Sequence, residues 1–90
     1  MPVTVEWMDD AHTIILQTYI TPWTWDEFYE ATAGQTISML NAVEHPVYII
    51  SDYTQGITLP TGSALTHARN ALSKTPPNLA GLYIISSSAF

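Results

Sequence analysis

Cysteine is absent from the 90-residue sequence, and basic residues are almost absent. Without cysteine the chain has no disulfides, no thiolate metal ligands and no cysteine nucleophile. Arg69 and Lys74 are its two cationic side chains against eight acidic ones, and the formal net charge is −6. Two positive charges cannot follow a phosphate backbone or hold an anionic lipid surface. The composition therefore argues against nucleic-acid binding and against electrostatic docking onto membranes.

Long hydrophobic runs and the common catalytic motifs are missing as well. No stretch approaches the roughly 20 apolar residues that cross a bilayer, and the amino terminus lacks the basic start and apolar core of a signal peptide. There is no nucleophile elbow, Walker loop, dinucleotide glycine fingerprint or paired-histidine zinc motif. We therefore expect a soluble cytoplasmic protein with no membrane span, and we predict no enzymatic activity and no cofactor or metal.

The chain is rich in apolar residues, which make up 47% of it, and only 11% of its residues are charged. Its length and composition predict a single domain spanning residues 1–90 with one hydrophobic core. A surface with so few charges leaves an apolar patch exposed on a monomer, and such patches usually mark contacts. We expect a protein partner or self-association into a homodimer.

Two strands are predicted in the first twenty residues. Val3, Val5 and Trp7 alternate with polar or flexible residues, which indicates a strand with one covered face. The β-branched and apolar stretch 13–20 predicts a second strand. Turn residues at 9–12 join the two strands, so we expect a hairpin.

A helix is predicted from Thr24 onward. Thr24 and Glu27 have the spacing of a capping box, in which each side chain satisfies the other residue's backbone N–H. Apolar residues at three- and four-residue steps continue to about Val43. Pro46 then precedes a short apolar run, Val47–Ile50, which predicts a central strand buried on both faces.

The last third of the chain predicts a second helix and a fourth strand. Pro60 suits the first turn of a helix, and Leu79–Ile85 is apolar enough for another buried strand. The contact face of the helix is expected at Leu65, Ala68, Ala71 and Leu72. Strands joined through helices pair in parallel. The sequence thus predicts an α/β domain of ββαβαβ order, with a mixed, mostly parallel four-stranded sheet and helices packed on it; the strand order stays open.

The hairpin, the helix start Trp23-Thr24-Trp25-Asp26-Glu27-Phe28-Tyr29, the strand end Ser51-Asp52 and the turn Leu59-Pro60-Thr61-Gly62-Ser63-Ala64 resemble the STAS-like fold. That group includes bacterial anti-sigma-factor antagonists and related single-domain proteins. The resemblance implies a regulatory or protein-interaction domain that is not an enzyme. It also implies a further helix after the fourth strand. Because the chain stops at Phe90, we expect that helix to be lacking and one sheet face to be bare for a second subunit.

In the antagonists, the segment between the third strand and the second helix carries a phosphorylatable hydroxyl and contacts a partner kinase. Here that segment is 52–64, and the resemblance makes Thr61 and Ser63 the candidate hydroxyls. The antagonists' Asp-Ser-Ser-Gly run is replaced by Pro60-Thr61-Gly62-Ser63.

Five residues are candidates for ligand binding or phosphorylation: Asp52, Thr61, Gly62, Ser63 and His67. Asp52 follows a central strand, where open α/β sheets place their ligand crevice, but an Asx turn also explains it. Thr61, Gly62 and Ser63 stand at a helix amino terminus, which suits either anion binding or capping. His67 lies one turn after Ser63 and is either a ligand contact or an ordinary helix residue.

Other patterns have simpler structural explanations. His12 beside Asp9 and Asp10 suggests a metal cluster, yet adjacent turn residues do not close a coordination sphere, and a hairpin turn explains them. His45 suits the negative end of a helix dipole. The three tryptophans, Trp7, Trp23 and Trp25, are expected to form one aromatic cluster, which either lines an apolar cleft or packs in the core.

Three functional classes remain open. A regulatory or interaction domain agrees best with the STAS-like pattern and the missing catalytic motifs. A small-molecule or lipid carrier is suggested by the apolar, aromatic-rich composition. A small hydrolase needs Ser63, His67 and Asp52 to converge within hydrogen-bond reach.

Overall fold

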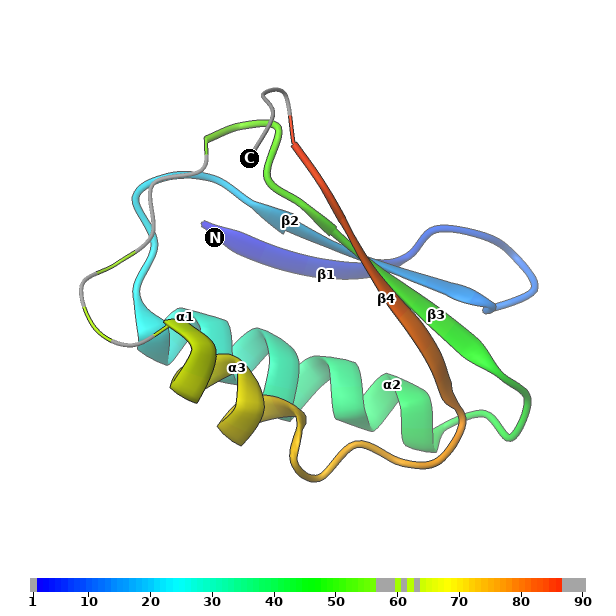
Figure 1. Ribbon diagram of the computed structural model, residues 1–90. Coiled ribbons are helices and arrows are strands. Elements are labelled where there is room, and N and C mark those ends of the chain that lie inside the picture. Colours follow the sequence, from blue (N-terminus) through cyan, green and yellow to red (C-terminus); the bar gives the residue numbers. More distant parts are fainter. Residues whose placement is uncertain (1, 57–59, 61, 63, 87–90) are drawn as a thin grey trace.

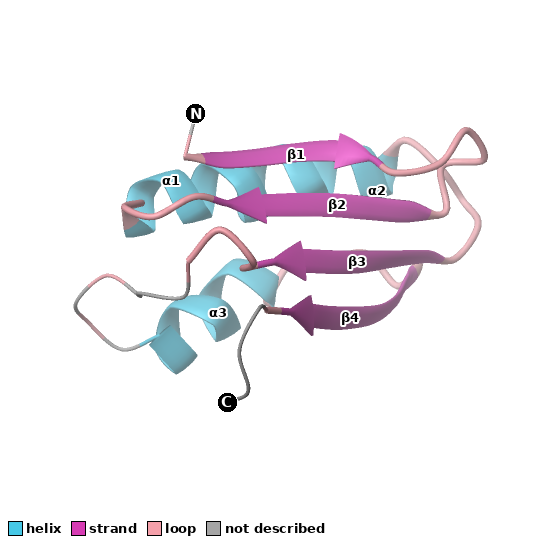
Figure 2. Ribbon diagram, turned by 90° about the horizontal axis from the view of Figure 1, so that it is seen from above, coloured by secondary structure: helices cyan, strands magenta, loops and turns pink. Residues whose placement is uncertain are grey.

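The computed structural model describes residues 2–56, 60, 62 and 64–86. These residues form a two-layer α/β structure in which all the helices lie on one face of a four-stranded sheet (Figures 1 and 2). The strands are β1 (Val3–Trp7), β2 (Ile14–Tyr19), β3 (Val47–Asp52) and β4 (Leu79–Ile85). The helices are α1 (Trp25–Tyr29), η1 (Glu30–Thr36), α2 (Ile37–Asn41) and α3 (Ala64–Leu72). No helix in this described part is long and apolar enough to span a membrane.

The strands lie in the sheet in their sequence order, β1-β2-β3-β4. β1 is antiparallel to β2, whereas β2, β3 and β4 are parallel to one another. This confirms the predicted ββαβαβ order and the mixed, mostly parallel sheet, and it supplies the strand order that the sequence left open. The carboxyl ends of the three parallel strands therefore meet at one rim of the sheet, from which the segment after β3 departs (Figure 2).

The hairpin turn and the first helix form as their local sequences predict. The Asp9 carboxylate accepts hydrogen bonds from the backbone N–H groups of Thr13, at 2.9 Å, and Ile14, at 3.1 Å, which closes the turn. At the helix start, the Glu27 N–H donates to the Thr24 hydroxyl at 3.2 Å, and the Thr24 N–H donates to the Glu27 carboxylate at 2.9 Å. The capping box is confirmed.

The first helix runs from α1 through η1 into α2, and η1 is a seven-residue π-helical segment. Such segments are rare and are often found at functional sites. The helix ends at Asn41, close to the predicted end at about Val43. The Asn78 amide donates to the carbonyls of Leu40, at 3.0 Å, and Val43, at 3.1 Å, and so ties the end of the helix to the start of β4.

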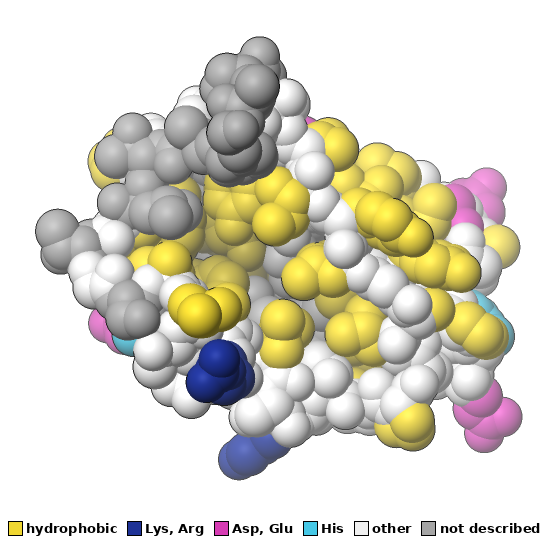
Figure 3. Space-filling view, viewed as in Figure 1, with side chains coloured by type: hydrophobic (Ala, Val, Ile, Leu, Met, Phe, Trp, Pro, Cys, Tyr) yellow, Lys and Arg dark blue, Asp and Glu magenta, His cyan; other side chains and the backbone are white. Residues whose placement is uncertain are grey.

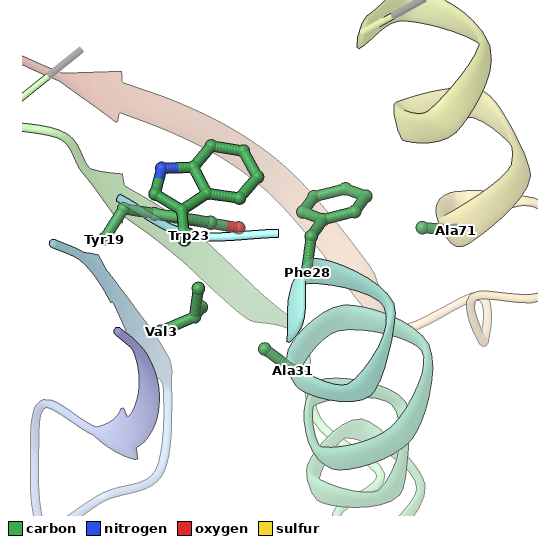
Figure 4. Close-up of a cluster of buried hydrophobic side chains, with 6 residues drawn as sticks. All are labelled: Val3, Tyr19, Trp23, Phe28, Ala31 and Ala71. Carbon is green, nitrogen blue, oxygen red and sulfur yellow. The ribbon is translucent and has the colours of Figure 1, made fainter. Parts of the chain in front are cut away.

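The core lies between the helices and one sheet face. One buried cluster joins the open end of the hairpin to α1, η1 and α3: Val3, Tyr19, Trp23, Phe28, Ala31 and Ala71 (Figure 4). A second lies under α2 and comprises Ile15, Leu40, Val47 and Ile49. Both clusters draw on the same sheet face because alternate strand residues point to opposite faces.

Three burial predictions are wrong, and one cause explains them. β3 is central but buried on one face only, β4 is an exposed edge strand, and Leu65 points to solvent with 70% of its surface exposed. Apolar runs predict burial on both faces only when a second layer covers the sheet, and the described residues supply one layer. On α3, Ala71 is buried and Ala68 and Leu72 are half-buried, so the helix packs through these three residues.

Candidate functional site

Asp52 lies at the carboxyl end of β3, where its side chain closes a local turn. One of its carboxylate oxygens accepts from the Thr54 backbone N–H at 2.8 Å and from the Thr54 hydroxyl at 2.6 Å. This is an Asx turn. The observed contacts of Asp52 are therefore those of the Asx turn that the sequence offered as its structural explanation.

Gly62 and His67 are brought together at the start of α3. The His67 ring stacks on Trp25 with ring centroids 4.4 Å apart, and its Nδ1 is 2.7 Å from the Tyr29 hydroxyl. Gly62 has a φ of +117°, and a Cβ on it would lie 3.3 Å from the Trp25 indole nitrogen. Sequence reasoning missed Trp25 and Tyr29 as partners of His67, because they lie far away in the chain. Thr61 and Ser63 lie outside the described residues.

The hydrolase hypothesis requires Asp52 to orient the His67 ring, and the two residues do not meet. His67 belongs to α3, on the helix side of the sheet, and its Nδ1 contacts a phenol rather than a carboxylate. Asp52 follows the buried Ser51 and therefore points to the opposite sheet face. Asp52 cannot orient the His67 ring from there, so the proposed Ser63, His67 and Asp52 triad gets no support from its two described members.

His12, in the hairpin turn, packs against Trp7. The His12 ring stacks on Trp7 with centroids 4.4 Å apart and planes 1° from parallel. His45 Nε2 lies 2.8 Å from the His12 carbonyl oxygen and therefore donates to it. The pKa of Asp9 is lowered, first by the Thr13 hydroxyl and then by the backbone N–H groups that it accepts from. Within the described ranges, no group of three or more acidic, histidine or cysteine side chains is placed to hold a metal ion.

The predicted cluster of three tryptophans is wrong in one member. Trp23 and Trp25 meet edge to face with centroids 5.2 Å apart, and both belong to the cluster near α1. Trp7 lies with the second cluster, at the hairpin end of the sheet. The separation follows from β1 itself, because five extended residues carry Val3 and Trp7 to opposite ends of the strand.

The second sheet face carries an apolar surface that no described residue covers. We call it the open sheet face; its apolar side chains are Ile14, Leu16, Tyr48, Ile50, Tyr83 and Ile85, which alternate with the helix-facing residues of β2, β3 and β4. Cross-strand pairing sets Leu16, Ile50 and Tyr83 in one row across the sheet. Figure 2 views the molecule from this side, with the helices behind the strands.

Charge on the open sheet face is confined to its border and is acidic. Glu6 extends the row of Leu16 on β1, and Asp52 ends β3; the remaining positions, Thr4, Thr18 and Gly81, are neutral. Tyr48 and Tyr83 are 42% and 57% exposed, with ring centroids 6.1 Å apart. Large aromatic rings in this state are typical of contact surfaces rather than of a solvated sheet face.

A buried polar network lies on the opposite, helix-facing side. The Gln17 amide nitrogen donates to the hydroxyls of Thr36, at 2.8 Å, and Thr32, at 3.4 Å. Its carbonyl oxygen accepts from the hydroxyls of Tyr19, at 3.0 Å, and Ser51, at 3.2 Å. Each of the four hydrogen-bonding positions of the amide is used. The network fixes the π-helical segment against β2 and β3, since both threonines come from η1.

Two tyrosines at this network have perturbed acidity. Tyr19 stacks on Tyr53 with centroids 4.5 Å apart, and burial raises the pKa of both phenols above the ordinary value of 10.0. Burial acts in this direction because the charged phenolate loses hydration. The neutral phenols are therefore the forms that the fold stabilises.

We expect the free energy of unfolding to fall as the pH rises above 10.0, the ordinary phenol pKa. The folded state holds these two protons more tightly than the unfolded chain, so their stabilisation is full below that pH and is lost above it. Urea unfolding on both sides of that pH measures the loss. The double variant Tyr19→Phe, Tyr53→Phe should lower stability at neutral pH but flatten the alkaline decline; an unchanged decline in this variant would contradict the assignment.

Comparisons of the chain with protein-family models, with curated proteins and with solved structures found no match. The functional argument therefore starts from the two features that the geometry provides, the open sheet face and the polar network with the space beside it.

Proposed function

We propose that this domain is a non-enzymatic interaction module that binds another protein through its open sheet face. The observation that carries the proposal is the row of Leu16, Ile50 and Tyr83, apolar side chains paired across three strands on an uncovered face. A domain gains stability by covering such a surface, at roughly 25 cal/mol for each Å² of apolar area removed from water. A partner that covers the row removes the same apolar area from water, and this burial favours binding against the entropy lost on association.

The border charges define the partner's chemistry. Glu6 and Asp52 flank the apolar row, and the chain as a whole carries a net charge of −6. A protein with an apolar patch bordered by lysine or arginine complements both features. A second copy of this chain would bring two acidic borders and two net negative charges together, so we favour a different, basic protein as the partner. The homodimer expected from the sequence would use this same face and is the competing alternative.

The resemblance to STAS-like proteins supports the same function. In that group, small α/β domains act by binding regulatory partners, including kinases, and a regulatory role for this chain is part of the proposal. The amino-terminal hairpin and the two strand–helix crossovers agree with that resemblance. Phosphorylation at Thr61 or Ser63 is a further consequence of the resemblance and stays a prediction.

Affinity capture with matched variants tests the proposal. Tyr83→Asp places a charge at the β4 end of the apolar row, whereas Leu65→Asp places the same charge at an exposed site on α3. We expect wild type and Leu65→Asp to retain a common protein, identified by mass spectrometry, that Tyr83→Asp loses. Retention should fall about tenfold or more for Tyr83→Asp and should weaken as salt is added, because the borders attract charge.

Two results would overturn the proposal. In the first, no captured protein distinguishes Tyr83→Asp from Leu65→Asp. In the second, light scattering shows the wild-type chain to be a dimer that Tyr83→Asp dissociates, which would assign the open sheet face to self-association. Circular dichroism of both variants establishes that each is folded before capture is compared.

A further inference from the structure

A cavity of about 100 Å³ lies between the helices and the carboxyl half of the sheet. Its walls come from Phe28 on α1, Ala68 and Leu72 on α3, and Leu82 and Ile84 on β4. α3 packs against η1 and stands off β4, which leaves this space open beside the edge strand. Figure 3, viewed from the side of β4 and α3, shows hydrophobic side chains around the hollow. The cavity is on the helix side of the sheet, separate from the open sheet face.

The lining decides the charge of any occupant. None of the described residues around the cavity is charged; besides its apolar walls it has Gln17, Tyr19, Thr32, Ser51 and Tyr53. An ionised group placed there would lose its hydration without an opposite charge to replace it, at a cost of several kcal/mol or more. The occupant is therefore an uncharged molecule.

The size of the cavity decides the size of the occupant. A dry apolar cavity of about 150 Å³ holds one benzene molecule, and pockets for drug-sized ligands start at about 300 Å³. The present cavity, at about 100 Å³, is smaller than that but open on one side, so a single small ring can enter it with one edge at the opening, and a lipid acyl chain is too large. Three aromatic side chains, Tyr19, Phe28 and Tyr53, border it and provide faces and edges for a ring to pack against.

The hydrogen bonds in the cavity lining indicate which polar group a bound aromatic ligand would carry. Ser51 Oγ donates its proton to Gln17 at 3.2 Å, so its hydroxyl can serve a ligand in the cavity only as an acceptor. Gln17 has no capacity left, because its four positions bind Thr32, Thr36, Tyr19 and Ser51. Ser51 therefore offers an acceptor to the cavity, and a ligand with one O–H or N–H donor complements it.

We propose that this cavity is a binding site for a small uncharged aromatic molecule with one hydrogen-bond donor, of the phenol or indole class. The π-helical segment η1 supports the site from behind, since Thr32 of that segment both lines the cavity and holds Gln17. π-Helical segments are frequently found at functional sites. The proposal is independent of the interaction surface on the other sheet face.

Phenol and toluene are the matched probes, because they have nearly the same shape and only phenol has the donor. Two-dimensional NMR of the ¹⁵N-labelled chain should show saturable phenol binding, with shifts at Ser51, Tyr53 and the carboxyl half of β4. Toluene should bind about fivefold to tenfold more weakly, the worth of one hydrogen bond. Ser51→Ala should bring the two affinities close together while leaving toluene binding nearly unchanged.

Filling the cavity gives a second arm. Ala68→Leu places a larger side chain in the cavity and should weaken phenol binding by about tenfold or more. Ala33→Leu makes the same change on the exposed side of η1 and should leave phenol binding unaltered. If circular dichroism shows that Ala68→Leu is unfolded, the comparison of phenol and toluene binding to Ser51→Ala tests the site by itself. Shifts that do not saturate, that map to the open sheet face, or that persist in Ala68→Leu would overturn the site.

Discussion

Leu40→Ala is expected to lower the free energy of unfolding by about 3 kcal/mol, a large share of the 5–15 kcal/mol typical of a domain. Leu40 is 0% exposed and packs with Ile15, Val47 and Ile49 beneath α2. Truncation removes buried methyl groups and leaves a cavity that the neighbouring strands fill only partly. Urea unfolding monitored by tryptophan fluorescence measures the change.

Leu65→Ala is the matched control for Leu40→Ala, because it makes the same substitution in another helix. Leu65 is 70% exposed, so its truncation should change stability by less than about 0.5 kcal/mol. Sequence periodicity assigns both leucines to a buried face, and only the structure separates them. Equal losses for the two variants would show that α3 packs differently from the arrangement described above.

Gln17→Met is expected to destabilise the fold by about 2–4 kcal/mol, although methionine matches glutamine in length and is more hydrophobic. The change removes the acceptor of the Tyr19 and Ser51 hydroxyls, two donors that are left in a buried environment. The Thr36 hydroxyl loses one of its two hydrogen bonds, since it still donates to the Ala31 carbonyl at 2.8 Å. Chemical denaturation gives the free-energy difference.

A double-mutant cycle separates the network from simple packing. Tyr19→Phe should cost about 1 kcal/mol in wild type and clearly less in the Gln17→Met background, where its hydroxyl has already lost its acceptor. Equal costs in both backgrounds, or a Gln17→Met protein as stable as wild type, would show that the hydrogen bonds around Gln17 contribute little.

Local chemistry in the sequence predicts the elements that local chemistry controls. The capping box at Thr24 and Glu27, the alternation along β1 and the turn after Trp7 each depend on residues a few positions apart. The topology followed from the order of strands and helices, because strands joined through helices pair in parallel. The strand order itself depends on which edges meet, and no local pattern encodes that.

The burial of individual residues and their long-range side-chain contacts could not be predicted in the same way. The apolar residues of β4 indicate a buried strand, but burial depends on a layer of structure that must come from elsewhere, and the described residues cover one face only. Gln17 is a polar residue in a strand, and nothing nearby in the sequence indicates that threonines from η1 and Ser51 from β3 enclose it. His67 and Tyr29 likewise meet across 38 positions of the chain.

The candidate site proposed from the structure differs from the one predicted from the sequence for the same reason. Sequence reasoning placed function in the segment 52–64, where Asp52 proves to close its own turn and Thr61 and Ser63 lie outside the described residues. The open sheet face comes from alternate residues on three strands, so it exists only once the pairing is known. Two signals were available beforehand: the low charge content predicted an exposed apolar patch, and the STAS-like resemblance predicted a bare sheet face, but neither identified the residues that form it.

Hydroxyl-radical footprinting of the chain with and without its captured partner tests most directly whether the open sheet face is the binding surface. Tyr48 and Tyr83 are exposed in the free chain and should oxidise readily, whereas the buried Tyr19 should not. On binding, the account predicts protection of Tyr48 and Tyr83, with the reactivity of Leu65 on α3 unchanged. Full reactivity of both tyrosines in the complex, with protection at Leu65 instead, would contradict it.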